Sequence, residues 1–129
     1  MKNNNIEAIY PLTPIQEGIL YHCLIAPESG QYYQQYSCRL GKLDDITLWR
    51  DCWQQVMNRH PILRTLFTWK NRERPLQVVK EKVQLPWQCI DWRSLSKKEQ
   101  DQRWIFLLER DRDRGFTLDT VPLLRITMV

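Results

Sequence analysis

The chain has 129 residues, of which 43% are hydrophobic and 26% are charged. This size and balance are those of one soluble globular domain, and they exclude an intrinsically disordered chain. The 19 basic and 15 acidic residues leave a formal net charge of +4, and the two signs are interspersed. A basic surface for nucleic acid is therefore not expected.

Membrane spans and metal sites are not expected either. The longest apolar runs contain only a few residues, and the polar N-terminal stretch does not resemble a signal peptide. Four cysteines lack both CxxC spacing and histidines at zinc-finger spacing. We expect reduced, partly buried thiols in a cytoplasmic protein, with a disulfide framework or a metal site as the weaker alternative. The cysteines are Cys23, Cys38, Cys52 and Cys89.

The first predicted element is a helix over residues 14–24. Thr13 is suited to be its N-cap, and Gln16 follows at the spacing of a capping box. Residues 31–40 then alternate loosely between two faces, which predicts a half-buried strand.

A second helix is predicted over residues 46–59, with Asp44 or Asp45 as its cap and Pro61 as its stop. Trp, Cys, Val and Met side chains recur on one face at helical spacing, which favours a core position over a substrate wall. His60 ends this helix, where a partly positive imidazole suits the dipole, so a capping role is favoured over a catalytic one.

The second half of the chain is predicted to alternate between strands and one long helix. An alternating-sign stretch over residues 109–114 is interpreted as a solvated helix face with local ion pairs. The last segment is the most apolar strand, so we expect the chain to be one piece of a larger unit. The predicted segments are strands over 62–69 and 76–79, an extended piece over 83–92 broken by Pro86, a helix from Ser94 or Ser96 to about 114 that ends at Gly115, a loop over 117–121 and a buried strand over 123–129.

The resulting order, α-β-α-β-β-α-β, indicates an α+β or mixed α/β domain. Phosphate-binding glycine loops, zinc-protease motifs and nucleophile elbows are absent from the sequence. Physical reasoning from the residues therefore yields a soluble domain without a visible active site.

Three segments together resemble the N-terminal part of the condensation domains of nonribosomal peptide synthetases. Residues 10–22 read YPLTPIQEGILYH, similar to the opening motif of that family. Residues 59–67 read RHPILRTLF and match every fixed position of the pattern Arg-His-x-x-Leu-Arg-Thr-x-Phe. Residues 115–118 and 122–125 read GFTL and PLLR, like the family's Phe-Asp-Leu and Pro-Leu-Leu-Arg.

The resemblance implies one lobe of a chloramphenicol-acetyltransferase-like fold, a mixed sheet flanked by about three helices, over residues 1–129. In the family, two lobes enclose a tunnel where carrier-bound aminoacyl or peptidyl thioesters are joined. A His-His-x-x-x-Asp-Gly motif follows shortly after the Pro-Leu-Leu-Arg strand. The expected catalytic histidine would lie beyond Val129, so this chain alone is predicted to be inactive. The implied partners are carrier domains, which bring phosphopantetheine, and a C-terminal lobe; the chain itself is expected to bind no cofactor.

The resemblance also assigns roles to individual residues. Arg64 corresponds to the arginine that pairs with the aspartate of the His-His motif; without that partner we expect it to be exposed, water-bound or re-paired. On the opening helix, Gln16, Glu17 and Tyr21 would line the tunnel, although Glu17 also suits the first helical turn. The structural motif comprises Arg59, His60, Leu63, Arg64, Thr65 and Phe67.

Two other functions stay open. The chain is alternatively a non-catalytic module that docks a carrier or linker domain, and a bare apolar patch would then favour self-association. A related acyltransferase of the same fold is the third interpretation, and it needs the same histidine.

Overall fold

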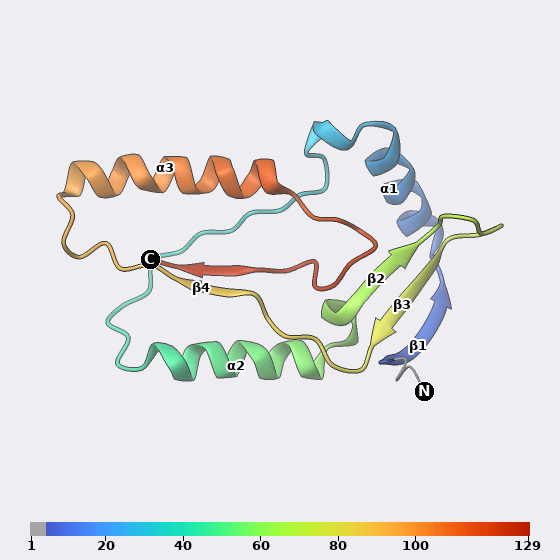
Figure 1. Cartoon of the computed structure of the whole chain (residues 1–129), viewed down its shortest axis with the longest axis horizontal. Coiled ribbons are helices and arrows are strands. Elements are labelled where there is room, and N and C mark those ends of the chain that lie inside the picture. Colours follow the sequence, from blue (N-terminus) through green and yellow to red (C-terminus); the bar gives the residue numbers. More distant parts are fainter. Residues whose placement is uncertain (1–4) are drawn as a thin grey trace.

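A computed structural model describes residues 5–129 of the chain. It contains three α-helices, five strands and two short 3₁₀ helices among these residues. The elements are β1 (Ile6–Pro11), α1 (Pro14–Ile25), η1 (Pro27–Ser29), α2 (Ile46–Arg59), η2 (Pro61–Arg64), β2 (Thr65–Thr68), β3 (Leu76–Lys80), β4 (Trp87–Cys89), α3 (Lys97–Arg114) and β5 (Ile126–Met128). Figure 1 shows α2 and α3 on either side of β4 and β5, with α1 and the other strands at one end.

Two of the helices begin with capping boxes: the one predicted at α1, and one at α3, where the sequence left the cap open between Ser94 and Ser96. Thr13 accepts a hydrogen bond from the Gln16 amide at 3.3 Å, and the Gln16 side chain accepts one from the Thr13 amide at 2.8 Å. Ser96 and Glu99 repeat this exchange at the start of α3. Each exchange satisfies amides that have no partner within the helix, so the starts of α1 and α3 are locally encoded.

A three-stranded antiparallel sheet has the order β1-β3-β2. Ile9 and Leu66 both lie opposite Val78 of the central strand. The sequence pattern does not predict β1. This strand lies at the edge of the sheet and is mostly exposed, so it lacks the apolar alternation of a buried strand.

The predicted strand over residues 31–40 is wrong. This segment has no regular secondary structure after a short turn, and no strand among residues 5–129 pairs with it. A strand needs a hydrogen-bonded neighbour, and alternation alone does not supply one. The segment is instead attached to α3 by the side chains of Tyr33 and Gln35.

Three further predicted strands are shorter than expected. The strand over 62–69 begins with η2, so only its second half is extended. Of residues 83–92, only β4 is a strand, because the Gln54 side chain pairs with the carbonyl of Val83 at 2.9 Å and the amide of Leu85 at 2.8 Å. The terminal strand is reduced to β5, which pairs in parallel with β4 and is only partly buried.

The main core cluster lies between α2 and the pair of strands β4 and β5. Met57 is fully buried, and Trp53 packs beside it. The predicted core stripe of α2 is correct for these two residues and wrong for Cys52 and Val56, which are exposed. The cluster consists of Met57, Val83 and Leu85, with Trp53, Leu63, Trp87, Val121, Leu124 and Ile126 packed against it.

The thiols are more accessible than the sequence predicts. All four cysteines are free, and Cys23 alone is half-buried. Burial raises the pKa of the Cys23 thiol. In the described part of the chain, no helix combines the length and apolarity needed to cross a bilayer.

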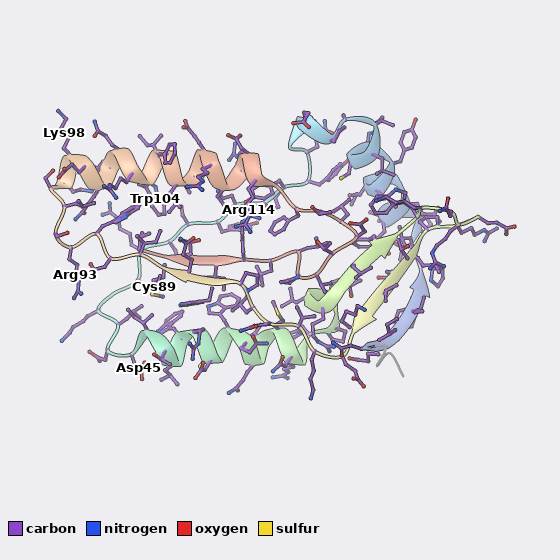
Figure 2. All side chains as sticks on the ribbon, in the orientation of Figure 1. Asp45, Cys89, Arg93, Lys98, Trp104 and Arg114 are labelled. Carbon is purple, nitrogen blue, oxygen red and sulfur yellow. The ribbon has the colours of Figure 1, made fainter. Side chains whose placement is uncertain are left out.

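The molecule is unusually open. A folded monomer of 15.7 kDa exposes about 7,300 Å² by the scaling of surface with mass, whereas this chain exposes 10,471 Å². Side chains project into open space around both long helices, and Lys98 on α3 points away from the sheets (Figure 2). The single layers of helix and sheet therefore leave apolar surface uncovered, including Ile15 on α1, which is 76% exposed.

Candidate functional site

The central strand β3 brings the first two motif segments together. Gln77 of β3 lies opposite Tyr10 on one side and Phe67 on the other. Its side-chain amide also lies 3.3 Å from that of Gln16 and donates to the Pro11 carbonyl at 3.0 Å. The opening motif and the Arg-His motif are thus adjacent through a strand that carries no motif residue itself.

The third motif segment joins the same region through the backbone. The amide of Phe67 in β2 donates to the carbonyl of Leu118 at 2.8 Å. Residues 115–118 of the third motif therefore join the first two segments around one sheet, whereas residues 122–125 lead into β5 of the other sheet.

Arg64 directly precedes β2, at the end of the sheet away from the contacts of Gln77, and is buried, with 4% of its surface exposed. Its Nη1 donates to the Glu7 carboxylate at 2.6 Å and to the Glu81 carbonyl at 3.2 Å, and it also contacts the Lys80 carbonyl. Its Nε donates to the Met57 carbonyl at 3.2 Å. Of the three predicted alternatives for Arg64, the re-paired state is the one observed.

The remaining terminal nitrogen of Arg64 is not used in the same way. Among residues 5–129, Nη2 has no acceptor within hydrogen-bonding distance. A guanidinium can hold a carboxylate through two nitrogens. Arg64 is therefore fixed in place and retains donor capacity for a further acceptor.

Glu7 supplies the charge that balances Arg64, and no pattern in the sequence pointed to it. The register of β1 against β3 shifts between Ile6 and Ala8, which marks a bulge at Glu7. Such bulges re-aim a side chain relative to the regular alternation of a strand. The carboxylate is partly exposed whereas the arginine is not, so Glu7 lies at the rim of the site.

The other residues of the Arg-His motif shape the turn that carries Arg64. Arg59 and His60 are exposed at the end of α2, and the His60 amide donates to the Val56 carbonyl at 3.1 Å. Thr65 is buried, and its hydroxyl donates to the Pro61 carbonyl at 2.9 Å. Leu63 and Phe67 are half-buried. These contacts hold the backbone on both sides of Arg64.

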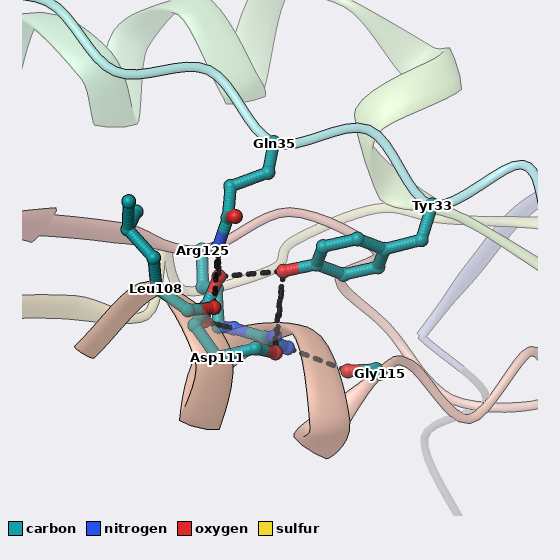
Figure 3. A network of polar contacts seen from close by, with 6 residues as sticks. All are labelled: Tyr33, Gln35, Leu108, Asp111, Gly115 and Arg125. Carbon is teal, nitrogen blue, oxygen red and sulfur yellow. Dashed lines mark hydrogen bonds and ion pairs between the residues drawn. The ribbon is translucent and has the colours of Figure 1, made fainter. Parts of the chain in front are cut away.

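A second arginine, Arg125, is partly buried and lies in the Pro-Leu-Leu-Arg segment just before β5 (Figure 3). Its Nε contacts the Asp111 carboxylate, its Nη1 donates to the Gly115 carbonyl at 2.6 Å, and its Nη2 donates to the Tyr33 hydroxyl at 2.9 Å. The guanidinium carbon lies 4.3 Å from the centre of the Phe116 ring. Every nitrogen of this side chain is therefore used within the molecule.

Asp111 is the acceptor at the centre of this second network. Its carboxylate accepts from the Tyr33 hydroxyl at 2.5 Å and from the Gln35 amide at 2.9 Å, in addition to Arg125. Burial alone would raise the pKa of the Asp111 carboxyl, but the hydrogen bonds from Arg125, Tyr33 and Gln35 outweigh it and the pKa lies below its ordinary value. Burial and the bond to Asp111 raise the pKa of Tyr33, so its hydroxyl stays protonated and donates.

The interpretation of residues 109–114 as a solvated helix face is wrong for Asp111. Leu107, Leu108 and Asp111 share one partly buried side of α3. An acidic residue one turn after two leucines is a signal for a buried partner, because a carboxylate is costly to bury unpaired. That signal could have identified Asp111, whereas nothing in the sequence indicated Tyr33 or Gln35.

The three residues predicted to line a tunnel lie on α1 in different surroundings. Gln16 is half-buried and committed to the helix cap and to Gln77. Glu17 and Tyr21 are exposed. Within residues 5–129, no three His, Cys, Asp or Glu side chains gather as metal ligands.

Comparison with known proteins matches the chain to a family and to several relatives. The family model of the condensation domain matches residues 6–129. Two linear gramicidin synthase proteins of Brevibacillus parabrevis are 42% and 38% identical over 127 and 128 residues, or 98% and 99% of this chain. A mycosubtilin synthase protein of Bacillus subtilis is 35% identical over 96% of the chain. The chain spans only 2% of each of the two gramicidin synthase proteins and 5% of the mycosubtilin synthase protein.

A solved structure has the same fold. It is a four-domain nonribosomal peptide synthetase in its holo form, bound to AMP and glycine, and it superposes with a TM-score of 0.70 at 22% identity. The match covers 95% of this chain and 9% of that protein. The α+β class and the chloramphenicol-acetyltransferase-like arrangement predicted from the sequence are thereby confirmed. The chain belongs to the condensation-domain family of nonribosomal peptide synthetases.

Proposed function

We propose that residues 1–129 form the N-terminal part of a condensation domain that joins two carrier-bound thioesters. The acceptor amine attacks the donor thioester carbonyl, a C–N bond forms, the C–S bond breaks, and the amine proton passes to the departing thiolate. The observation that carries this proposal is that parts of all three motif segments meet around the sheet β1-β3-β2, with Arg64 buried just before β2. The chain contains two histidines, His22 and His60, and neither stands in a His-His motif.

We assign Arg64 the role of orienting the loop that carries the catalytic histidine. Its Nη2 is the nitrogen that would receive the aspartate of the His-His motif, because the other two nitrogens are already bound. A buried arginine fixed by three carbonyl oxygens loses little further freedom on binding that aspartate. The Arg64 guanidinium would then bind two carboxylates, that of Glu7 and that of the aspartate. Arg59 and His60 support the same turn from the end of α2.

The proposal also names partners. Carrier domains would present their substrates on phosphopantetheine, and a C-terminal lobe would cover the apolar surface that this chain exposes. Glu17 and Tyr21, exposed on α1, would face the substrate path between the lobes. The unpaired thiols suit a reducing, cytoplasmic setting.

An assay of amide formation tests the proposal. The synthetase that carries this sequence is mixed with donor-loaded and acceptor-loaded carrier domains, and the carriers are weighed by intact-protein mass spectrometry. We expect dipeptidyl carrier from the synthetase and none from the 129-residue chain alone. Dipeptide formed by the 129-residue chain alone, or none formed by the synthetase, would contradict the proposal.

The exposed apolar surface also supports the second candidate, a module that docks carrier or linker domains without catalysis. Titration of the isotopically labelled chain with a carrier domain, followed by NMR, separates the two. Shifts confined to α1 and its neighbours, together with a synthetase that forms no amide, would favour docking alone.

A further inference from the structure

The network of Tyr33, Asp111 and Arg125 connects three parts of the chain that are far apart in sequence. Tyr33 belongs to the irregular segment after η1, Asp111 to the last turns of α3, and Arg125 to the residue before β5. Figure 3 shows the three polar groups meeting from these three elements. One arginine and one carboxylate thus link the residue before β5 directly to α3.

The network has the features of a rigid fixing point. Arg125 and Asp111 are both mostly buried, with side chains 11% and 27% exposed. Their polar atoms are satisfied by each other, by Tyr33 and by the Gly115 carbonyl, and Phe116 covers the guanidinium. Fully satisfied buried networks define a single geometry, in contrast to exposed ion pairs.

We propose that Asp111 and Tyr33 are positioning residues for the condensation reaction, which hold Arg125 and thereby the direction of β5. This inference rests on the proposed function, in which the His-His motif follows shortly after the Pro-Leu-Leu-Arg segment. A shift of β5 would displace the imidazole from the acceptor amine. A displacement of about 1 Å in such a geometry costs on the order of 100-fold in rate.

The chain offers matched control variants for this test. Asp111→Asn removes the charge at the network, whereas Asp113→Asn makes the same change two residues later at an exposed site on α3. Tyr33→Phe removes only the hydroxyl, whereas Tyr32→Phe does so at the exposed neighbour. Asp111→Glu keeps the charge and tests for partial rescue.

The first arm measures amide formation by the synthetase, per folded molecule. We expect Asp111→Asn to lower kcat by about 10- to 100-fold with KM for the loaded acceptor carrier unchanged, and Tyr33→Phe to lower it less. Asp111→Glu should recover part of the loss. A merely structural role would lower the folded fraction and leave kcat per folded molecule at the wild-type value, and that result would overturn the inference.

The second arm needs no activity, because it follows amide hydrogen exchange in the 129-residue chain. The amides of Ile126 and Ile90 join β5 to its surroundings through Pro86 and Met128 at 3.0 and 2.9 Å. We expect Asp111→Asn to speed their exchange several-fold while Val78, in the other sheet, is unchanged. Equal exchange in the Asp111→Asn and Asp113→Asn variants would refute the role of Asp111.

The two arms separate this inference from the proposed function. If the wild-type synthetase forms no amide while exchange at Ile126 responds to Asp111→Asn, the proposed function fails and the fixing of β5 stands. If the wild type forms amide and all variants equal their controls, the inference fails alone.

Discussion

Arg64 and Arg125 solve the same physical problem at two places in the chain. Each guanidinium is removed from water, each is balanced by one carboxylate, and each donates to backbone carbonyls. Leaving such a charge without partners in the interior costs several kcal/mol. The carbonyls define where each arginine lies, and the carboxylates of Glu7 and Asp111 neutralise the positive charges.

Removing the Arg64 side chain should destabilise the protein strongly. Arg64→Ala leaves Glu7 and the carbonyls of Met57 and Lys80 without their donor, so we expect a loss of about 3 kcal/mol in the free energy of unfolding. Urea unfolding followed by circular dichroism measures it. Arg93→Ala, which removes an exposed ion pair with Asp91, should cost under about 1 kcal/mol. Equal losses in the two variants would show that Arg64 does not hold its buried partners together.

Asp111 should make stability depend on acid pH. Its folded-state pKa lies below the unfolded value of about 3.9. Its contribution is therefore present above about pH 4 and is lost as the pH falls through the lower folded-state pKa. Melting temperatures measured from pH 7 to pH 2 should separate wild type from Asp111→Asn at neutral pH and converge in acid. Asp91 and Glu99, whose pKa values are also lowered, should preserve part of the fall in melting temperature with decreasing pH in the variant. A fall identical to that of wild type would exclude Asp111 as a contributor.

At the scale of elements, the helix starts are determined by residues close in sequence, whereas the strands are determined by residues far apart in sequence. The starts of α1 and α3 depend on side chains three residues apart, so a local pattern was enough to predict the start of α1 and to narrow that of α3 to Ser94 or Ser96. The strands depend on neighbours far along the chain. Residues 31–40 have the alternation of a strand and no partner strand among the described residues, whereas β1 has little alternation and a partner in β3.

The cap of α3 provides a direct measure of that local encoding. Ser96→Ala removes the acceptor of the Glu99 amide, and we expect a cost of about 1 kcal/mol in unfolding free energy. Ser94→Ala, just outside the helix, should be neutral within about 0.5 kcal/mol. Thermal and urea unfolding of both variants would compare them, and an unaffected Ser96→Ala protein would show that the cap does not stabilise α3.

The sequence predicted residues of the candidate site only where these residues belong to a family motif. Arg64 and its flanking residues came from a family pattern, and the structure places them together. Glu7 depends on a bulge in β1, and Tyr33 depends on an irregular segment crossing to α3. Neither arrangement is visible in a periodic pattern, because each arises from the tertiary path of the backbone.

At the scale of the whole molecule, the exposed surface determines whether the chain associates with itself. The excess of exposed area over that of a compact monomer is about 3,000 Å², which is the amount that large permanent interfaces bury. Part of it is apolar surface on α3, where Phe106 is exposed. A chain with such a face should associate with itself when no partner covers it.

Self-association of the 129-residue chain is therefore the expected result in sedimentation velocity at micromolar concentration. Phe106→Glu should shift the distribution toward monomer, because it replaces an exposed aromatic ring of α3 with a charge. Gln102→Glu, one turn earlier on the same side and already exposed, adds the same charge without removing apolar area. A wild-type chain that stays monomeric at every concentration would contradict this expectation.

The most direct test of the central claim is dipeptide formation by the synthetase that carries this sequence, compared between Arg64→Ala and Arg93→Ala under conditions where both are folded. We expect Arg93→Ala to retain the wild-type rate and Arg64→Ala to lose at least about 100-fold, with carrier binding unchanged. A wild-type rate in folded Arg64→Ala protein would contradict the role assigned to Arg64.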